Sequence, residues 1–487
     1  MQNVARTTGP RAAAGAEEAL ATRIARAVAE LSLAQLPEAV ADKTRGEVVD
    51  KTRGEVVDKT KVCLMDLIGC AFEARDLPWS RQAVQLAAPV AEGAGAATVI
   101  GAPHPAAAGD AAFANAVMGH GLVREDMHAG SISHLGIVVL PALLALAQSR
   151  PVAGRDFIAA TAAGYEVGGQ IGRALMDAAV ARIFRPTGIT GPVAAAAAGA
   201  RLLGFDAGQT ASALVLAANT AAGFNQWAHT GGSEMFFHAG FAARNALTAV
   251  RLAGLGAFAS PSGLDGEAGL FAALGKREAA VRVRLFAGPP ELLSVYHKPL
   301  PACNFAQTPC QAALRIARES GCPPERIASV VVRVSRAGAA YPGCDYRGPF
   351  AHVLQAKMSI QYNVATALIR GELSEASFGL LDDASVRRLI GLTTLQVDDD
   401  MTRAYPGKQG AEVEVREVSG ATHRVRLDDV VNATTAEVRA RFRGAAASVL
   451  GAARAGEIEG FIDCLELSED VGRLGTLLRG AGAAGGR

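Results

Sequence analysis

The sequence predicts a mostly α protein with an α+β part: a large all-helical domain interrupted by a smaller α+β lid domain. At 487 residues, the chain is longer than one ordinary hydrophobic core accommodates, so two domains are expected. Half of the residues are hydrophobic but only 5% are aromatic, and an apolar content of mostly Ala, Leu and Val favours closely packed helices. The residue pattern changes from helical to mixed after about residue 290.

The helical domain is expected to begin near residue 20. Apolar residues recur at helical spacing in residues 156–174, 191–203 and 207–222, with Gly, Pro and Asp between these segments. The apolar run 137–147 is too short to span a bilayer, so it predicts a buried helix.

The α+β domain is expected over residues 295–430. Strands are predicted at 326–335 and 392–397, and a hairpin at 412–418 and 422–427, with helices near 308–320 and 356–371. The helical domain is expected to comprise residues 20–294 and 431–478. Disordered tails are expected at residues 1–19 and 479–487.

A tandem duplication lies near the start of the chain. Asp-Lys-Thr-Arg-Gly-Glu-Val-Val occupies residues 42–49 and again 50–57. Two copies do not make a repeat architecture. We expect one copy to extend a solvated helix end or to loop out.

Composition excludes several classes of protein. A net charge of +1 gives no electrostatic reason to bind nucleic acid. The seven cysteines are scattered without paired CxxC motifs, which favours reduced thiols over a zinc ribbon or a disulfide framework. With no secretory signal in the first twenty residues and no membrane segment, we expect a cytoplasmic protein. P-loop, GxSxG and HExxH motifs are absent, and the GxGxxG at 480–485 follows no strand.

Segment 120–134, His-Gly-Leu-Val-Arg-Glu-Asp-Met-His-Ala-Gly-Ser-Ile-Ser-His, concentrates titratable side chains. It holds three of the nine histidines and the adjacent acids Glu125 and Asp126. Such groups are costly to bury in apolar surroundings without a function. Polar packing, metal binding and acid–base catalysis are the three interpretations. The eight- and six-residue histidine spacings do not match a compact HxxxH metal pair, so acid–base catalysis is preferred.

Two cationic residues adjoin predicted structural boundaries. Lys298 lies in the proline-bracketed stretch 296–304 at the domain junction. It is a solvated surface group, a ligand for a substrate carboxylate or a proton-transfer group with a pKa lowered by burial. Arg185 precedes the Pro-Thr-Gly turn 186–188 and an expected helix at 192–203. This turn is either a simple N-cap or an anion site to which Arg185 adds a guanidinium.

A Gly-rich loop with two histidines is predicted at 227–240. It leads into an expected helix at 242–255. His238 either binds substrate or packs at the start of that helix.

These elements, in this order, resemble the MmgE/PrpD family, which includes 2-methylcitrate dehydratase, cis-aconitate decarboxylase and iminodisuccinate epimerase. The resemblance extends from about residue 20 to about residue 478. Its most specific pieces are Asn-Ala-Val-Met-Gly-His at 115–120 with its acidic continuation, Pro-Thr-Gly at 186–188 before an Ala-rich helix ending at 201–206, His-Ala-Gly at 238–240, Lys-Pro-Leu-Pro at 298–301 and the helix at 355–365.

The resemblance implies a site between a helical domain and an α+β lid domain, usually in a homodimer. It also implies that no metal and no cofactor take part. By position, His134 and Lys298 match family active-site residues, and Glu125 and Asp126 match part of an acidic cluster. We therefore expect catalytic roles for Asp126, His134 and Lys298, and substrate binding by Glu125, His128, Arg185 and His238.

The chain departs from the family pattern at three places. Val123 stands where the family commonly has Asp, and Arg185 stands where a His often precedes the turn. Met235 and Phe236 occupy the stretch in which a Lys often lies. These departures remove a proton donor or acceptor and a cation from the expected pocket.

The expected function is a cofactor-independent lyase of the hydro-lyase type. It would act on a small di- or tricarboxylate related to 2-methylcitrate or aconitate by removing a proton α to a carboxylate. His134 or a neighbouring carboxylate would be the base, Lys298 and Arg185 would hold carboxylates, and Asp126 or His128 would assist the departing hydroxyl. The alternatives are an epimerase, isomerase or decarboxylase of a related carboxylate, or a non-catalytic carboxylate-binding protein.

Overall fold

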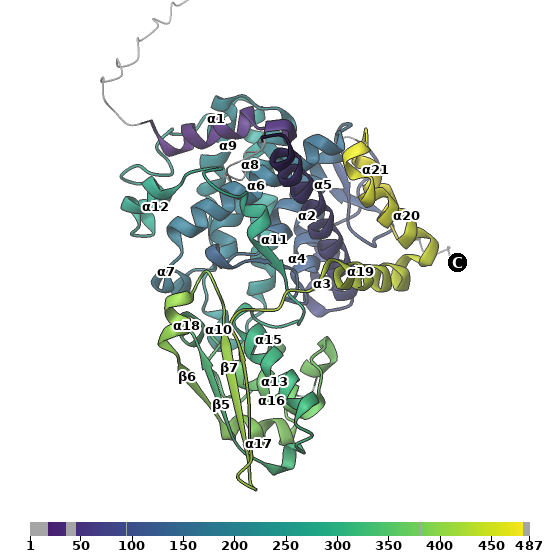
Figure 1. Cartoon of the computed structure of the whole chain (residues 1–487). Helices are drawn as coiled ribbons and strands as arrows, with labels where there is room; N and C mark the ends of the chain where they lie inside the picture. The colour runs from purple at the N-terminus through teal and green to yellow at the C-terminus, as the bar shows by residue number, and fades with distance from the viewer. Residues whose placement is uncertain (1–17, 36–44, 94, 380, 481–487) are drawn as a thin grey trace, which may run out of the picture.

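The computed structural model describes residues 18–35, 45–93, 95–379 and 381–480, and for residues 35 and 45–52 it describes the backbone only. A helical part and an α+β part, residues 298–430, lie at opposite ends of the molecule (Figure 1). The mostly helical class with some α+β structure is confirmed. Most of the two predicted tails, residues 1–17 and 481–487, lies outside the described residues.

Five helices that carry or support the candidate site form the centre of the helical part. Ala and Gly in their contact faces allow the backbones to approach closely. A Cβ added at Gly164 would lie 2.9 Å from the Cβ of Ala198, and one at Gly168 would lie 2.7 Å from the Cβ of Ala194. The five helices are α4 (Ala108–His120), α5 (Gly136–Ala147), α6 (Gly154–Leu175), α8 (Pro186–Leu203) and α11 (Glu234–Gly254).

Further helices cover this centre. The C-terminal helices return to it, since α19 packs against α2 and α21 packs against α5 (Figure 1). No helix among the described residues is long and apolar enough to cross a membrane. The remaining helices of this part are α1 (Leu20–Glu30), α2 (Arg45–Ala74), α3 (Pro78–Leu86), α7 (Ala178–Ile183), α9 (Ala207–Ala218), α12 (Leu270–Ala273), α19 (Thr435–Leu450), α20 (Ala452–Asp463) and α21 (Gly472–Leu477), together with α10 (Trp227–Thr230), which packs on the α+β part.

The duplicated segment extends a helix. From Arg45 onward, α2 runs without a break through the second copy and on to Ala74. Val56 and Val57 of the second copy are buried. The described part of the duplication therefore adds helix length and does not loop out.

The helical part is not all-helical, which corrects the sequence-based expectation. Two short antiparallel sheets lie within it: β1 (Ala96–Thr98) with β2 (Pro105–Ala107), and β3 (Asp126–His128) with β4 (Val295–His297). The segments around β3 and β4 are buried, and buried backbone groups must find hydrogen-bond partners. Pairing two distant loops meets that need.

The α+β part is built on a four-stranded sheet of order β6-β5-β7-β8. β5 is parallel to β6 and antiparallel to β7, and β7 and β8 form the predicted hairpin. Both predicted helices are present, although the second divides at Ser359 into α15 and α16. The elements are α13 (Gln307–Glu319), β5 (Ile327–Val334), α14 (Arg336–Ala340), α15 (Val353–Met358), α16 (Ile360–Arg370), α17 (Ala384–Leu392), β6 (Thr393–Val397), α18 (Asp399–Ala404), β7 (Ala411–Glu417) and β8 (Thr422–Leu427).

Two helices begin earlier than predicted. α8 starts at Pro186, because proline suits the first position of a helix, where its missing N–H costs nothing. α11 starts at Glu234, so His238 lies inside a helix and not in a loop before it. Tertiary packing supports both first turns, since Gly188 and Gly191 of α8 and Met235 and Phe236 of α11 are buried.

The chain passes from the helical part to the α+β part near residue 298 and returns near residue 430, and these two connections lie side by side. The backbone N–H of Ala433 donates to the carbonyl oxygen of His297 at 2.9 Å. Arg441 of α19 donates to the carbonyl oxygen of Lys298, also at 2.9 Å. The stretch that carries Lys298 is therefore fixed at the junction of the two parts.

Candidate active site

Segment 120–134 is a buried loop. It leaves α4 at His120, forms β3, makes a 3-10 turn at Ala129–Ser131 and enters α5 at Gly136. Val123 (φ 59°) and Ile132 (φ 53°) adopt the left-handed backbone conformation, which is rare for β-branched residues. Strain of this kind persists where the surrounding structure enforces it, and it concentrates at functional sites.

Glu125 lies at the centre of the titratable cluster in this loop. Its Oε1 lies 2.5 Å from Nδ1 of His120 and 2.8 Å from Nδ1 of His134. All three side chains are buried. Oε2 of Glu125 is buried too and has no hydrogen-bond partner among the described residues. One carboxylate therefore orients two imidazole rings.

Neighbouring groups fix which ring nitrogen carries the proton in each histidine. Nδ1 of His134 lies 3.1 Å from the carbonyl oxygen of Asp126, which can only accept, so Nδ1 is the donor and Nε2 keeps a lone pair. Nδ1 of His120 faces the carboxylate of Glu125, which accepts, so Nδ1 is the donor in that ring. Its Nε2 lies 3.1 Å from Nη2 of Arg185 and 2.9 Å from the sulfur of Met235. No described residue bonds to Nε2 of His134. His134 thus carries an unprotonated, unpaired ring nitrogen.

The charges in the cluster favour an ionised carboxylate between neutral histidines. Burial raises the pKa of Glu125, but the two flanking histidines and Lys298 hold that pKa well below its usual range. Burial lowers the pKa of His134 to about 3, although Glu125 opposes the shift. Burial also lowers the pKa of His120. An anion that entered beside these rings would raise the pKa values of both.

A small cavity lies beside His134 where the helical and α+β parts meet. Its volume is about 20 Å³, which is room for about one water molecule. The helical part contributes Val123, Met127, Ile132, His134, Arg185, Trp227 and Met235 to its wall, and the α+β part contributes Cys303, Asn304, Phe305, Tyr341 and Met358.

Arg185 is the cation in the cavity wall. It is the N-cap residue of α8, and its Nη1 donates to the hydroxyl of Tyr341 at 3.3 Å. Its Nη2 lies 3.7 Å from the sulfur of Met235. Its Nε is buried without a partner among the described residues. The guanidinium therefore has hydrogen-bonding capacity left for an anionic ligand.

Two buried lysines tie the α+β part to segment 120–134. The ammonium of Lys298 donates to the carbonyl oxygen of Val123 and, at 3.3 Å, to that of Ala302. Lys357 of α15 donates to the carbonyl oxygens of Leu122 and Pro301, both at 3.1 Å. Lys298 lies behind the cavity wall, where its charge acts on Glu125 and His134.

Three other predicted site residues lie outside the cavity wall. The carboxylate of Asp126 accepts a hydrogen bond from Tyr165 at 2.5 Å, and burial raises its pKa. Nε2 of His128 lies 2.6 Å from a carboxylate oxygen of Glu291. His238 lies near Arg185, and burial lowers its pKa to about 4. The structure thus brings His134 and Arg185 to the cavity and Glu125 directly behind them.

The cluster has the composition of a metal site. One ligand atom from each of His120, Glu125 and His134 lies within 4.8 Å of the others. The hydrogen bonds place protons on both Nδ1 atoms that face Glu125, and Arg185 and Lys298 add positive charge nearby. A metal ion would have to displace those protons and bind next to two cations.

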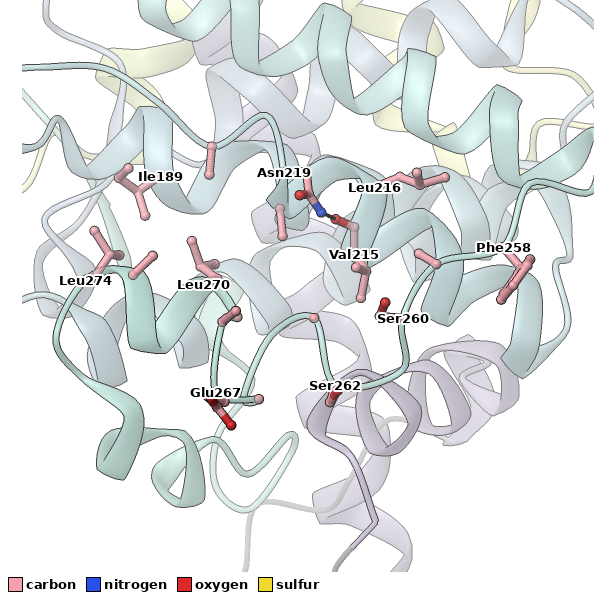
Figure 2. A pocket seen from close by; sticks show the side chains of 18 of the residues that line it. Ile189, Val215, Leu216, Asn219, Phe258, Ser260, Ser262, Glu267, Leu270 and Leu274 are labelled. Atoms are coloured by element: carbon pink, nitrogen blue, oxygen red, sulfur yellow. Dashed lines mark hydrogen bonds between the residues drawn. The ribbon is translucent and has the colours of Figure 1, made fainter. Parts of the chain in front are cut away.

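A much larger pocket lies away from these groups, on the helical part. It has a volume of about 860 Å³, and α9 and the loop after α11 line it (Figure 2). Its wall combines apolar side chains with backbone groups and the polar residues Asn219, Ser260, Ser262 and Glu267. The residues that line it include no histidine and no cation, so pocket size alone does not locate the chemistry.

Sequence reasoning misses several residues in or behind the cavity wall. His120 lies behind the wall, and its spacing of five residues from Glu125 is the signal that could find it. Met235 approaches Arg185 from α11 of the helical part. Tyr341, Cys303 and Asn304 carry no local signal, because their approach to segment 120–134 depends on how the two parts meet.

Comparisons with known proteins cover most of the chain. The MmgE/PrpD N-terminal domain model matches residues 38–282, and the MmgE/PrpD C-terminal domain model matches residues 300–467. The chain is similar to a cis-aconitate decarboxylase-like protein of Aspergillus oryzae, with 28% identity over 461 residues, which are 86% of this chain and 92% of that protein. It is also similar to a cis-aconitate decarboxylase of Aspergillus terreus, with 26% identity over 453 residues, which are 86% of this chain and 90% of that protein.

Proposed function

The chain belongs to the MmgE/PrpD family, and we propose that it is a metal- and cofactor-independent lyase of the hydro-lyase type that acts on a small di- or tricarboxylate. The observation that carries this proposal is the unpaired Nε2 of His134. It is a neutral base in the wall of a buried cavity, oriented through Nδ1 by Asp126 and Glu125.

His134 would remove the proton α to a substrate carboxylate. The C–H electron pair would move into the carbonyl system of that carboxylate, and the proton would move to Nε2. Glu125 favours the resulting imidazolium, because its charge lies 2.8 Å from Nδ1. A nitrogen with a pKa near 3 is a weak base, so substrate carboxylates must raise that pKa on binding.

Arg185 would bind a substrate carboxylate and stabilise the enolate-like intermediate. Its guanidinium already holds the hydroxyl of Tyr341, and a hydroxyl can also donate. Tyr341 would therefore assist the departing hydroxide with a proton, in a step that follows the rate-limiting removal of the α-proton by His134. Asp126 and His128 are less suited to that step, since their side chains are engaged by Tyr165 and Glu291 outside the cavity wall.

The α+β part would act as a lid. A cavity of about 20 Å³ cannot hold a tricarboxylate, so binding requires the two walls to separate. Lys298 and Lys357 bond across the junction to two adjacent carbonyl groups of segment 120–134. In the opened state, Lys298 would be released from Val123 and could reach a substrate carboxylate.

Decarboxylation is the second candidate function, because the two relatives compared above are named as a cis-aconitate decarboxylase and a similar protein. It would use the same cations. The C–C bond to one carboxylate would break, carbon dioxide would leave, and the electron pair would stay on carbon, delocalised towards a remaining carboxylate. A protonated His134 would then deliver a proton to that carbon.

The test is a thermal-shift screen of small di- and tricarboxylates, since a ligand that binds only the folded state raises the melting temperature. Ligands that bind would then be followed by NMR in D₂O. Hydro-lyase activity predicts an alkene and water, decarboxylation predicts bicarbonate, and epimerisation predicts α-deuterium without an alkene. Binding without turnover across the panel would identify a carboxylate-binding protein and overturn the proposal.

The absence of a metal has its own test. Turnover after dialysis against EDTA should equal turnover before it, and added Zn²⁺ or Mn²⁺ should not increase it. A loss that only metal restores would assign His120, Glu125 and His134 as ligands. The family resemblance also supports a homodimer, which light scattering of the purified protein would test.

A further inference from the structure

Two buried cysteines of the α+β part lie against each other. The sulfur atoms of Cys303 and Cys344 are 3.6 Å apart, although 41 positions separate the residues in the chain. Both are free thiols with almost no exposed surface. Forming a disulfide would require the two sulfurs to approach to ~2.05 Å.

The surroundings make the two thiols unequal. Burial raises the pKa of Cys303, but the thiol of Cys344, the backbone N–H of Phe305 and the cations Lys298 and Arg185 lower that pKa below its usual value. Burial raises the pKa of Cys344 well above its usual value. Cys303 is thus the better thiolate, and Cys344 is a protonated neighbour that hydrogen-bonds to it.

The pair is directly connected to the cavity. Cys303 lines the cavity itself, together with Asn304 and Phe305. The backbone N–H of Cys344 donates to the carbonyl oxygen of Tyr341 at 3.0 Å, and the hydroxyl of Tyr341 contacts Arg185. A disulfide between these sulfurs would therefore shift the two segments of the α+β part that lie near Arg185, residues 303–305 and 341–344.

We propose that Cys303 and Cys344 are a redox modification site: a small hydroperoxide oxidises Cys303, Cys344 resolves it, and the resulting disulfide reversibly inactivates the protein. A reactive thiolate with a second cysteine in contact is the arrangement that converts a single oxidation into a reversible disulfide. The formation of the disulfide does not depend on which reaction the cavity catalyses.

The chemistry balances in two steps. The Cys303 thiolate attacks the terminal oxygen of the hydroperoxide, the O–O bond breaks, and the products are the Cys303 sulfenate and an alcohol, or water when the oxidant is hydrogen peroxide. The sulfenate takes a proton from solvent to become the sulfenic acid, and the Cys344 thiol then attacks its sulfur: the S–O bond breaks, a disulfide forms, and the hydroxide leaves as water with the thiol proton. The sulfurs lose two electrons in total, and the peroxide gains them. A dithiol reductant reverses the change.

Peptide mapping of the full-length protein tests the proposal. Native protein is treated with stoichiometric hydrogen peroxide, its remaining thiols are alkylated, and it is digested without reductant. We expect a crosslinked peptide pair containing Cys303 and Cys344, lighter by two hydrogens than the sum of the peptides. Dithiothreitol should release both, and ligand binding or turnover should fall with the crosslink and recover with its reduction.

Variants separate this site from general oxidation. In Cys344→Ser, peroxide should leave a Cys303 sulfenic acid that a diketone probe traps, with no crosslink. Cys310→Ser is the matched control, because Cys310 is buried in the same part of the molecule and its thiol donates to the carbonyl oxygen of Asn363 at 3.7 Å, not to a second cysteine. It should form the crosslink as the unsubstituted protein does.

Two results would overturn the proposal. One is a pair of free thiols at Cys303 and Cys344 after a peroxide dose that oxidises the exposed Cys464. The other is a crosslink that forms only in denaturant. If the crosslink formed in the native protein but left ligand binding and turnover unchanged, the disulfide would stand and its inactivating effect would be wrong.

Discussion

The two walls of the junction cavity are built in opposite ways. The wall from the helical part takes its proton-transfer groups from one short segment, in which His120, Glu125 and His134 lie within fifteen residues. The wall from the α+β part takes its residues from three separate places, 303–305, 341 and 358. The first wall has a base with a carboxylate directly behind it and strained backbone, and the second wall has mostly neutral groups.

This difference suggests a division of labour. Proton transfer requires donors and acceptors held within a fraction of an ångström, which a locally determined and buried loop provides. Admission and enclosure of a ligand require a wall that moves, which a separately packed part provides. Substitutions in the first wall should therefore lower kcat, and substitutions in the second should mainly raise KM. The predictions below run from the largest expected effect to the smallest.

Replacing His134 with Ala should have the largest effect. The substitution removes the base, and loss of a general base typically lowers the rate by ~10²–10⁴-fold. The loss should appear in kcat, with KM changed much less, in initial-rate measurements on whichever carboxylate the screen identifies. His229→Ala is the matched control, since His229 is an exposed histidine of the same part. Equal losses in both variants, or none in His134→Ala, would contradict the assignment.

Glu125→Gln should have the next largest effect. It preserves the shape of the side chain but removes the charge that favours a protonated His134, so kcat should fall by ~10–100-fold, as for other residues that orient a reacting group. Glu125 raises the pKa of His134, so its loss lowers that pKa further. The acidic limb of the kcat/KM pH profile should move to lower pH. A limb that moved to higher pH would show that another group is the base.

The contrast between the walls also explains what the sequence could predict. Segment 120–134, the strands of the α+β part and most helices follow local periodicity and spacing, so their existence was predictable. Local sequence features and the family resemblance predict roles for His134 and Arg185, and both residues line the cavity. The starts of α8 at Pro186 and of α11 at Glu234 could not be predicted from the sequence, because tertiary packing overrides local propensity there.

The roles within the segment required three-dimensional information. Asp126 and Glu125 are adjacent and chemically alike, and only the direction of each side chain separates them. Strand β3 turns Asp126 towards Tyr165, and Glu125 turns towards the two histidines. Tyr341 had no local signal at all, since its role arises from the meeting of two parts of the chain.

The stability of the protein should fall with decreasing pH because of the first wall. His134 has a pKa of about 3 when folded and a usual value of 6.5, so below pH 6.5 the unfolded chain binds a proton that the folded chain does not. Its contribution to stability is present above pH 6.5 and is lost as the pH falls towards 3, by at most ~1.4 kcal/mol per pH unit. Urea unfolding at pH 6.5 and at pH 4.5 should show a smaller pH dependence in His134→Asn. The exposed-site variant His229→Asn should retain the full dependence, and an unchanged slope in His134→Asn would contradict the assigned shift.

Tyr341→Phe should have the smallest effect and tests the second wall. It deletes only the hydroxyl that Arg185 contacts at 3.3 Å, and a hydrogen bond of this kind contributes ~1 kcal/mol, or about fivefold in KM. Tyr346→Phe is the matched control, because it removes a hydroxyl from the same part that bonds to the carbonyl oxygen of Pro349 away from the cavity. KM should rise for Tyr341→Phe and not for Tyr346→Phe in initial-rate measurements. If Tyr341→Phe instead lowered kcat by as much as Glu125→Gln does, the hydroxyl would be a proton donor in the rate-limiting step, and the division of labour between the walls would not hold.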